Sequence, residues 1–259
     1  MVTEANTTKL VDLYFGDVLR NETGALIKRR SFHLERTLSF PDDAFTAQIQ
    51  SEYVKGAVPN EVTFNIPSAD LLNVDLSFVA TDNLQRLGSE GPLQTSVILP
   101  QKADVINTSS DFSRIKLSAV SSADEAPSPL FAFITEASLT INNNLSTNKA
   151  VGLLSAFNIT SGSFKVEMSV TAYFSDVAAV RAVRNNTDVT IDMAIVKNNQ
   201  GIMIDIPLAN LGEGRLNVEL DQPVTLPLSI NAATAEDLAT GFDHTLLLTF
   251  FGYLPTAAD

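Results

Sequence analysis

The two histidines are the side chains best suited to acid–base chemistry near neutral pH. His33 lies in a strand-like stretch, and His244 directly follows Asp243. Neighbouring side chains in an extended segment point to opposite faces, so Asp243 is badly placed to orient His244. A general acid–base site needs an orienting partner within hydrogen-bonding reach. We therefore interpret both histidines as structural or surface residues.

Nucleophiles, phosphate loops and metal ligands are equally scarce. The sequence has no cysteine, which excludes disulfides, thiolate metal sites and a cysteine nucleophile. It also lacks the G-x-S-x-G, P-loop and G-x-G-x-x-G patterns. The glycine-rich run 211–215 favours a turn, and the acidic pairs at 42–43 and 124–125 lack the spaced oxygen ligands of a calcium loop. These patterns predict a protein that is not an enzyme and uses no cofactor and no metal.

Composition predicts a folded, acidic chain. Its 259 residues are 45% hydrophobic and carry a formal net charge of −13, which disfavours tight binding to a nucleic-acid backbone. The length suits one large domain over 1–259, with a weak internal boundary at 121–129. No signal peptide and no apolar run long enough for a membrane-spanning helix are found, so no membrane partner is expected.

Alternation of polar and apolar residues predicts a mostly β fold. The two longest alternating runs are 72–81 and 164–174, and the apolar side chains of each are expected on a buried face. A helix is predicted over 177–184 after an N-cap at Ser175 or Asp176, and another over 8–20. Shorter strand-like runs lie at 61–66, 137–142, 187–196, 202–206, 215–220, 224–230 and 245–253.

The polar faces of the two longest predicted strands are the candidate functional surface. They combine hydroxyl, amide and carboxylate groups with a single lysine, and such a face is solvated. Their residues are Asn73, Asp75, Ser77, Thr81, Lys165, Glu167, Ser169 and Thr171. This face contacts either bulk water or the water inside an assembly.

A further pattern is carried jointly by segments 32–36, 61–82, 137–145, 161–176, 194–198 and 242–255. Together they resemble the tail tube proteins of long-tailed bacteriophages with non-contractile tails. The resemblance covers most of residues 31–255 and implies a β-sandwich with a flanking short α-helix. It also implies that the inner sheets of neighbouring subunits join into a continuous β-barrel tube.

The resemblance further implies a structural virion protein of the phage tail, assembled in the host cytoplasm. Rings of six subunits would stack into a hollow conduit for ejection of double-stranded DNA into the host. The tape-measure, tail terminator and distal tail proteins would be its partners. The candidate polar faces would then be lumen-facing, and residues 1–30 and the loop 85–111 would act as arms between rings.

Other interpretations remain open at this stage. One is a different virion β-sandwich, such as a capsid decoration or shell protein. Another is a carbohydrate-binding surface adhesin, although the chain has no tryptophan and no export signal. A β-sandwich hydrolase lacks its acid–base group. An N-I-x-S pattern at 65–68 and 158–161 precedes each long strand, so a trimer of duplicated domains stays open against a hexamer.

Overall fold

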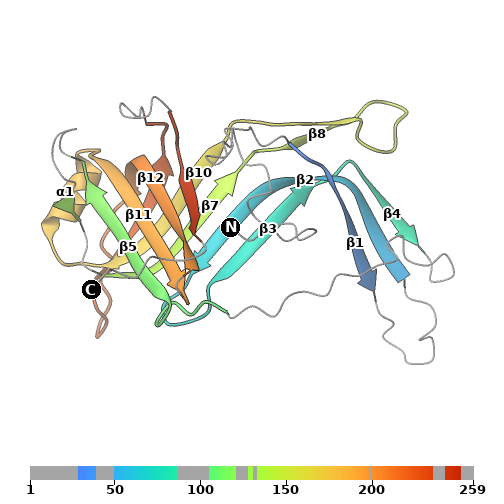
Figure 1. The fold of residues 1–259 in the computed structure, drawn as a ribbon. Helices are drawn as coiled ribbons and strands as arrows, with labels where there is room; N and C mark the ends of the chain where they lie inside the picture. The colour runs from blue at the N-terminus through green and yellow to red at the C-terminus, as the bar shows by residue number, and fades with distance from the viewer. Residues whose placement is uncertain are drawn as a thin grey trace.

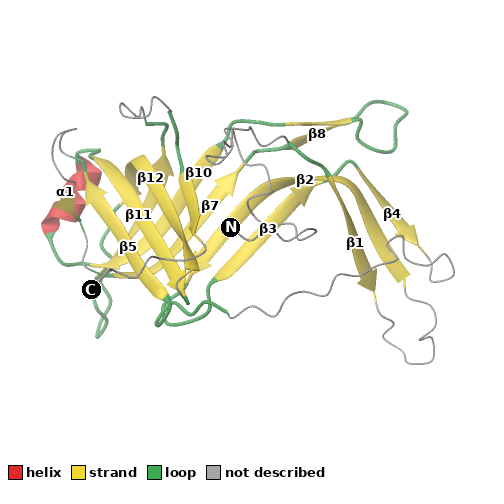
Figure 2. Ribbon diagram, in the orientation of Figure 1, coloured by secondary structure: helices red, strands yellow, loops and turns green. Residues whose placement is uncertain are grey.

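The structure is a computed structural model in which the polypeptide forms strands and a short helix (Figures 1 and 2). The predicted helix at 8–20 and most of the predicted loops 85–111 and 121–129 lie outside the described residues. The described residues are 29–38, 50–86, 105–120, 128–130, 133–198, 200–235 and 243–251.

In the described residues, strands follow one another along the chain and one helix interrupts them. The first seven strands are β1 (Phe32–Leu38), β2 (Gln50–Ile66), β3 (Asn73–Val79), β4 (Asp82–Arg86), β5 (Phe112–Ala119), β6 (Ser128–Pro129) and β7 (Ile134–Asn142). The remaining elements are β8 (Ser146–Asn148), β9 (Asn158–Thr160), β10 (Lys165–Tyr173), α1 (Val177–Arg184), β11 (Asp188–Lys197), β12 (Gln200–Glu213), β13 (Thr225–Ala232) and β14 (Leu247–Phe251).

Twelve of the strands in the described residues form one antiparallel sheet that folds over itself. Its main path runs β1-β2-β7-β10-β13-β12-β11-β5-β6, with β3 and β4 on β2 and β14 on β12. One layer of the resulting sandwich contains β3, β2, β7, β10 and β13, and the other contains β14, β12, β11 and β5 (Figure 1). We call these layers A and B. The mostly β, sandwich-like architecture with a flanking helix confirms the fold class predicted from the sequence.

The two longest strands of the described residues, β2 and β12, each change partners at a bend that contains a proline. The first part of β2 pairs with β1 and β4, and the part after Ala57 pairs with β3 and β7. A register shift lies between Pro59 and Glu61, and Gly56 has a positive φ of 61°. A Cβ atom at Gly56 would lie 2.5 Å from Thr81 Oγ1, so only glycine fits this position. Proline cannot donate to a sheet ladder, and a bulge tolerates it.

The bend in β12 carries the chain from layer B to layer A. Its first half pairs with β11 and β14, and residues 209–213 pair with β13. The partner strand β11 has a register shift between Val189 and Ile191, opposite Pro207. Thr190 Oγ1 donates to the Ile206 carbonyl at 3.1 Å, which satisfies one backbone acceptor at the bend.

The apolar face of the folded sheet forms a single core. Side chains on alternate positions of β2, β7, β10 and β13 are buried, as are those of β11 and the first half of β12. The largest fully buried side chains in the described residues include Leu139, Ile141, Ile191, Ile204, Leu226 and Leu228. Strands predicted at 137–142, 164–174, 187–196 and 224–230 are therefore confirmed, with small changes at their ends. The strand predicted at 202–206 is part of the longer β12, which continues to Glu213 and so includes the first three residues of the run 211–215 that was predicted to form a turn.

The helix is also confirmed at its predicted bounds. Asp176 is the N-cap, and its side chain accepts a hydrogen bond from Ala178 N at 3.2 Å. Ala179 and Ala182 are buried against the sandwich core. The chain leaves the helix at Asn185, and Asn186 takes the left-handed conformation.

The prediction of a strand at 215–220 is wrong. Residues 214–224 form an irregular connection, and Asn217 makes only an isolated bridge to Thr225. Their alternating apolar residues Leu216, Val218 and Leu220 are exposed, because no strand or layer among the described residues covers them. The two N-I-x-S segments also differ in place: the first ends β2 and turns back into its partner β3, whereas the second lies in β9, which pairs with β8.

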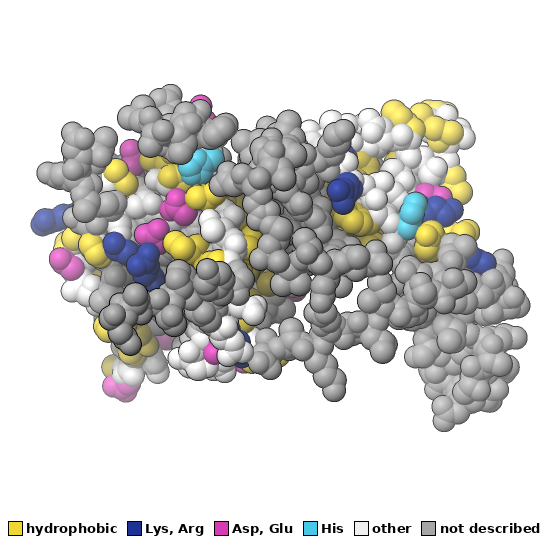
Figure 3. Space-filling view, in the orientation of Figure 1, with side chains coloured by type: hydrophobic (Ala, Val, Ile, Leu, Met, Phe, Trp, Pro, Cys, Tyr) yellow, Lys and Arg dark blue, Asp and Glu magenta, His cyan; other side chains and the backbone are white. Residues whose placement is uncertain are grey.

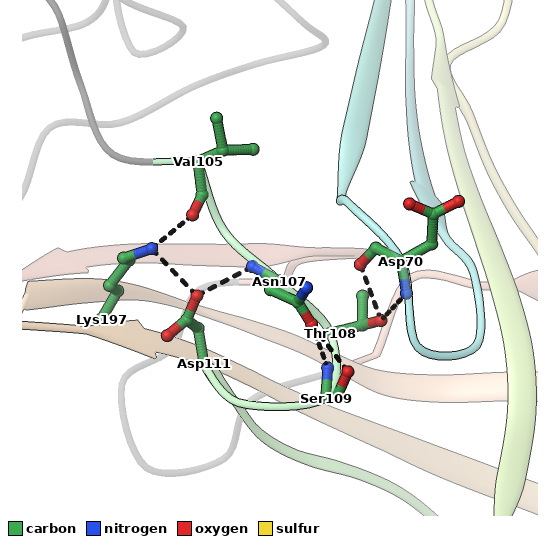
Figure 4. A network of polar contacts seen from close by, with 7 residues as sticks. All are labelled: Asp70, Val105, Asn107, Thr108, Ser109, Asp111 and Lys197. Atoms are coloured by element: carbon green, nitrogen blue, oxygen red, sulfur yellow. Dashed lines mark hydrogen bonds and ion pairs between the residues drawn. The ribbon is translucent and has the colours of Figure 1, made fainter.

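A polar cluster fastens the loop before β5 to the end of β11 (Figure 4). Lys197 Nζ lies 3.0 Å from Asp111 Oδ2 and also donates to the Val105 carbonyl. Asn107 N donates to the same Asp111 oxygen at 2.8 Å. The backbone hydrogen bond from Asn107 and the charge and hydrogen bond of Lys197 lower the pKa of Asp111 below its ordinary value of 3.8.

The same loop is joined to the turn between β2 and β3. Thr108 Oγ1 donates to the Asp70 carbonyl at 2.9 Å, and Thr108 N donates to the same oxygen at 2.9 Å. Leu72 N donates to the Ile106 carbonyl at 3.0 Å. The cluster therefore ties layer A to layer B at one end of the sandwich (Figure 4).

We expect Asp111→Asn to lower the melting temperature of the subunit by a few degrees at neutral pH, because an amide cannot form the ion pair with Lys197. A lowered folded-state pKa contributes stability that is present above pH 3.8 and is lost as the pH falls through the folded pKa. The difference between variant and wild type should therefore shrink below pH 3.8 in thermal denaturation scans. An equal difference at pH 3 and pH 7 would contradict this assignment.

Candidate functional site

The outer face of layer A carries continuous rows of polar side chains that cross its strands. In the central row, residues directly opposite one another share this face across β3, β2, β7, β10 and β13. The row consists of Asp75, Thr63, Thr140, Glu167 and Asn231. The two longest predicted strands thus contribute to one surface, although no hydrogen bond joins β3 directly to β10.

Neighbouring rows continue this surface. Asn73 lies opposite Asn65, which is followed across the sheet by Ser138, Ser169 and Ser229. On the other side of the central row, Ser77, Glu61, Asn142 and Lys165 lie in register. We call the outward-facing side chains of these three rows the polar face of layer A.

Hydrogen bonds between strands hold many of these side chains in place. Asn65 Nδ2 donates to Asp75 Oδ2 at 2.8 Å, and Ser138 Oγ donates to Asn65 Oδ1 at 3.1 Å. The hydroxyls of Thr63 and Thr140 lie 3.1 Å apart. Asn142 Nδ2 donates to Glu61 Oε2. These cross-strand contacts are the unit of sheet stabilisation and keep polar groups aligned along the surface.

A further pair extends this network beyond the three rows. Thr171 Oγ1 donates to Glu136 Oε1 at 3.0 Å. The rows and this pair together carry four carboxylates, on Glu61, Asp75, Glu136 and Glu167, against the single cation of Lys165. The polar face therefore has a negative potential at neutral pH.

The outer face of layer B differs in character. Arg114 and Lys116 lie on β5 opposite residues of β11, and the exposed apolar side chains Met203 and Phe250 lie on β12 and β14. Burial raises the pKa of Asp205 on this face, and the charge of Asp192 directly across from it raises the pKa further. Layer B thus lacks the uniform, hydrated acidic surface that layer A presents.

The edge strand β3 departs from the expectation of a buried apolar face. Val74 is 38% exposed and Leu76 is 44% exposed, because in the described part of the chain β3 pairs only with β2. Phe78, further along the same face, packs edge-on against Phe32 of β1 with ring centroids 6.3 Å apart. Among the described residues, one edge of β3 therefore has no strand beside it, and the apolar side chains of Val74 and Leu76 are open to water.

Thr81 lies apart from the other residues predicted to share its face. It follows the end of β3, in the short connection to β4. Its hydroxyl donates to the Lys55 carbonyl at 3.1 Å, and this hydrogen bond stabilises the bend in β2. The other seven candidate residues lie on β3 and β10, and all are exposed except Thr171, which is half-buried.

The histidines occupy separate places. The ring of His33 stacks on Tyr53 with centroids 5.7 Å apart, and His244 forms a backbone bridge with Ala235. Over the described ranges, no cluster of three metal-binding side chains is present. The one helix there is too short to cross a bilayer.

An open sheet with an apolar edge, a hydrated acidic face and a folded core defines a structural subunit that completes itself by assembly. Comparison with known families gives the same answer. The family model described as phage tail tube protein matches residues 2–232, so the chain belongs to the phage tail tube protein family. A comparison with curated proteins gives no match. The chain is therefore a structural component of the phage tail that self-assembles into the tail tube.

Sequence reasoning missed eight of the fourteen residues of the polar face. Glu61, Thr63, Thr140 and Asn231 belong to strands other than the two that supplied the candidate residues, and their place beside Asp75 depends on the register between strands. The alternation at 61–66 and 137–142 already signalled outward-facing polar residues in these strands. It did not signal that they share a surface with β10.

We expect Leu76→Lys to prevent or weaken self-assembly while leaving the subunit folded, since this side chain is half exposed before assembly. A loss of about 1.5 kcal/mol of apolar burial per interface raises the concentration needed for assembly by about tenfold. Sedimentation and circular dichroism of the purified protein measure the two effects. The matched control is Ser77→Lys, the next residue on the opposite face of β3, which should still assemble. Equal assembly by wild type and Leu76→Lys would contradict this role of the edge.

Proposed function

We propose that the polar face of layer A lines the bore of the tail tube and acts as a non-adhesive wall for double-stranded DNA. The observation that carries this proposal is the row of polar side chains that crosses five neighbouring strands, from Asp75 to Asn231. In this proposal Asn73, Asp75, Ser77, Lys165, Glu167, Ser169 and Thr171 face the lumen directly. In the same proposal Thr81 lies at the rim of the bore, because its hydroxyl donates to the Lys55 carbonyl at the bend in β2.

The physical problem of the tube is to let a polyanion slide without binding. Duplex DNA carries about one negative charge per 1.7 Å of its axis, so a lysine-rich wall would hold it. Carboxylates repel the phosphates, and hydroxyls and amides keep a layer of water at the surface. The hydrogen bonds within and between rows, such as Thr63 to Thr140, keep these side chains from reaching toward the DNA.

The proposed ring closes through the free edge of β3. Pairing of this edge with a neighbouring subunit would satisfy its backbone groups and cover Val74 and Leu76. Repetition of the contact would join the layer A sheets into a continuous β-barrel around the bore. We favour a true hexamer made of one domain per chain over a trimer of duplicated domains, because the two N-I-x-S segments occupy unlike places in the fold.

In this proposal the rings stack into the tube of a long, non-contractile tail through which the genome is ejected into the host cell. The subunit is made in the host cytoplasm and polymerises there around the tape-measure protein. The tail terminator and distal tail proteins cap the two ends. Stacking joins unlike surfaces, top to bottom, so the polymer is open-ended and needs a template to control its growth. Residues 1–30 and 85–111 are proposed as arms between rings.

We expect phage that carry Asp75→Lys and Glu167→Lys together to form tails of normal appearance but to release DNA more slowly, because the wall would then attract phosphates. The rate of triggered genome release and the infectivity per particle measure the effect. Raising the salt concentration should reduce the defect, because exposed charges are screened.

The matched control for this experiment is the neutral pair Asp75→Asn and Glu167→Gln, which removes the repulsion without adding attraction. Its release rate should lie between those of wild type and the lysine variant. Normal infectivity of the lysine variant, with normal tails in electron micrographs, would show that these two residues do not line the bore.

A further inference from the structure

The hairpin of β8 and β9 ends in a loop of apolar side chains that contact little of their own chain. Residues 149–157 form this loop, which extends from the body of the molecule above β1 and β4 (Figure 1). Leu154 is 99% exposed, and Val151, Leu153 and Phe157 are also exposed. Figure 3 shows these hydrophobic side chains gathered at the upper right of the molecule. We call this loop the hairpin tip.

The hairpin is held firmly at its base. Ala156 N donates to the Thr81 carbonyl at 3.0 Å, and Phe157 N donates to the Asn148 carbonyl at 3.0 Å. The guanidinium of Arg29 donates to the Ile159 carbonyl at 2.9 Å and to Ser161 Oγ at 3.2 Å. An apolar loop on a positioned arm is a surface that favours burial against a partner.

A second exposed apolar loop lies at the other end of the sandwich. Leu220 is 91% exposed and Val218 is 69% exposed in the connection 214–224, with Leu216 beside them. This is the segment whose alternation predicted a strand that the fold does not contain. We call it the acceptor loop, and Figure 3 shows hydrophobic and acidic side chains together at its position at the lower left.

Strand β10 separates the two loops. The hairpin leads into the start of β10 at Lys165, whereas the acceptor loop adjoins its end, where Tyr173 pairs with Thr225 and Phe174 N donates to the Val224 carbonyl at 3.0 Å. Nine residues of strand span about 30 Å. In a wall whose strands join edge to edge, the ends of the strands form its two rims. The hairpin tip and the acceptor loop therefore belong to opposite rims.

The two loops carry net charges of opposite sign, and both expose apolar side chains. The hairpin segment 146–160 contains one charged residue, the exposed Lys149. The acceptor loop contains Glu219 and Asp221 against Arg215, which leaves it acidic. We propose that the hairpin tip of one subunit docks on the acceptor loop of a second copy in the next ring. This inference rests on the proposed function, because it assumes that the edge of β3 closes the ring.

Cysteine cross-linking tests the contact directly, since the chain has no cysteine of its own. We would introduce Leu154→Cys into one preparation and Val218→Cys into another, mix them, allow assembly and oxidise. Both sites are exposed in the subunit, so neither change should disturb folding. The expected product is a disulfide-linked dimer in the mixture and none in either variant alone. A chain carrying both changes should give a ladder of multimers.

The matched control replaces Val218→Cys with Ser68→Cys, an exposed residue at the same end of layer A, and should give no cross-link. Tubes without the cross-link, or a dimer from Leu154→Cys alone, would overturn the proposed contact while leaving the tube itself in place. Absence of both rings and tubes in electron micrographs, with no cross-link, would overturn the proposed function together with this contact.

A second variant separates stacking from ring closure. Leu154→Asp places a carboxylate in the apolar contact and next to the acidic acceptor loop, so it should raise the concentration needed for stacking by about tenfold or more. Rings should persist, because Leu154 is 99% exposed and is not part of β3; the hydrogen bond to Thr81, just after β3, is made by the backbone of Ala156 and not by Leu154. Unchanged tube formation by Leu154→Asp at the wild-type concentration would count against the contact.

Discussion

The free edge of β3 is the constraint on which the rest of this structure depends. A strand at a sheet edge leaves its outer backbone groups without a neighbouring strand, and here the strand also exposes the apolar side chains of Val74 and Leu76. Natural sheets usually protect such edges with charges, bulges or a covering segment. A subunit that self-assembles has the opposite need, because its edge must remain available for the next copy. The apolar edge of β3 suits membership in a tail tube family.

Two bends allow strands of one sheet to change partners and the sheet to fold over a single core. The bulge at Pro59 lets the first half of β2 pair with β1 and β4 while its second half lies in layer A, paired with β3 and β7. The bend opposite Val189 lets β12 pass from layer B to layer A, so the sandwich closes over one core without breaking the sheet. Proline is tolerated at both bends, because a bulge leaves one residue without a ladder hydrogen bond.

Alternation across a pleated sheet gives layer A its two unlike faces. The same strands that bury Leu139 and Val170 in the core present Thr140 and Ser169 to water. The cross-strand pairs then align these outward groups into rows, and hydrogen bonds such as that from Asn65 to Asp75 hold them against the sheet. A flat, hydrated and acidic surface is thus a direct product of regular pairing. In the proposed tube, contacts between subunits fall elsewhere, at the edge of β3 and at the loops on the two rims.

The sequence by itself determined that most of the alternating segments are strands with two unlike faces, and it determined where the helix 177–184 begins and ends. These properties are local, because alternation and an N-cap such as Asp176 act within a few residues. Tertiary structure alone decided which strands are neighbours and which polar residues share a surface. Residues 215–220 show the difference: they alternate as well as β10 does, yet among the described residues they make only the isolated bridge from Asn217 to Thr225, and Val218 and Leu220 remain exposed. Pairing and register depend on partners far along the chain, so a local pattern cannot supply them.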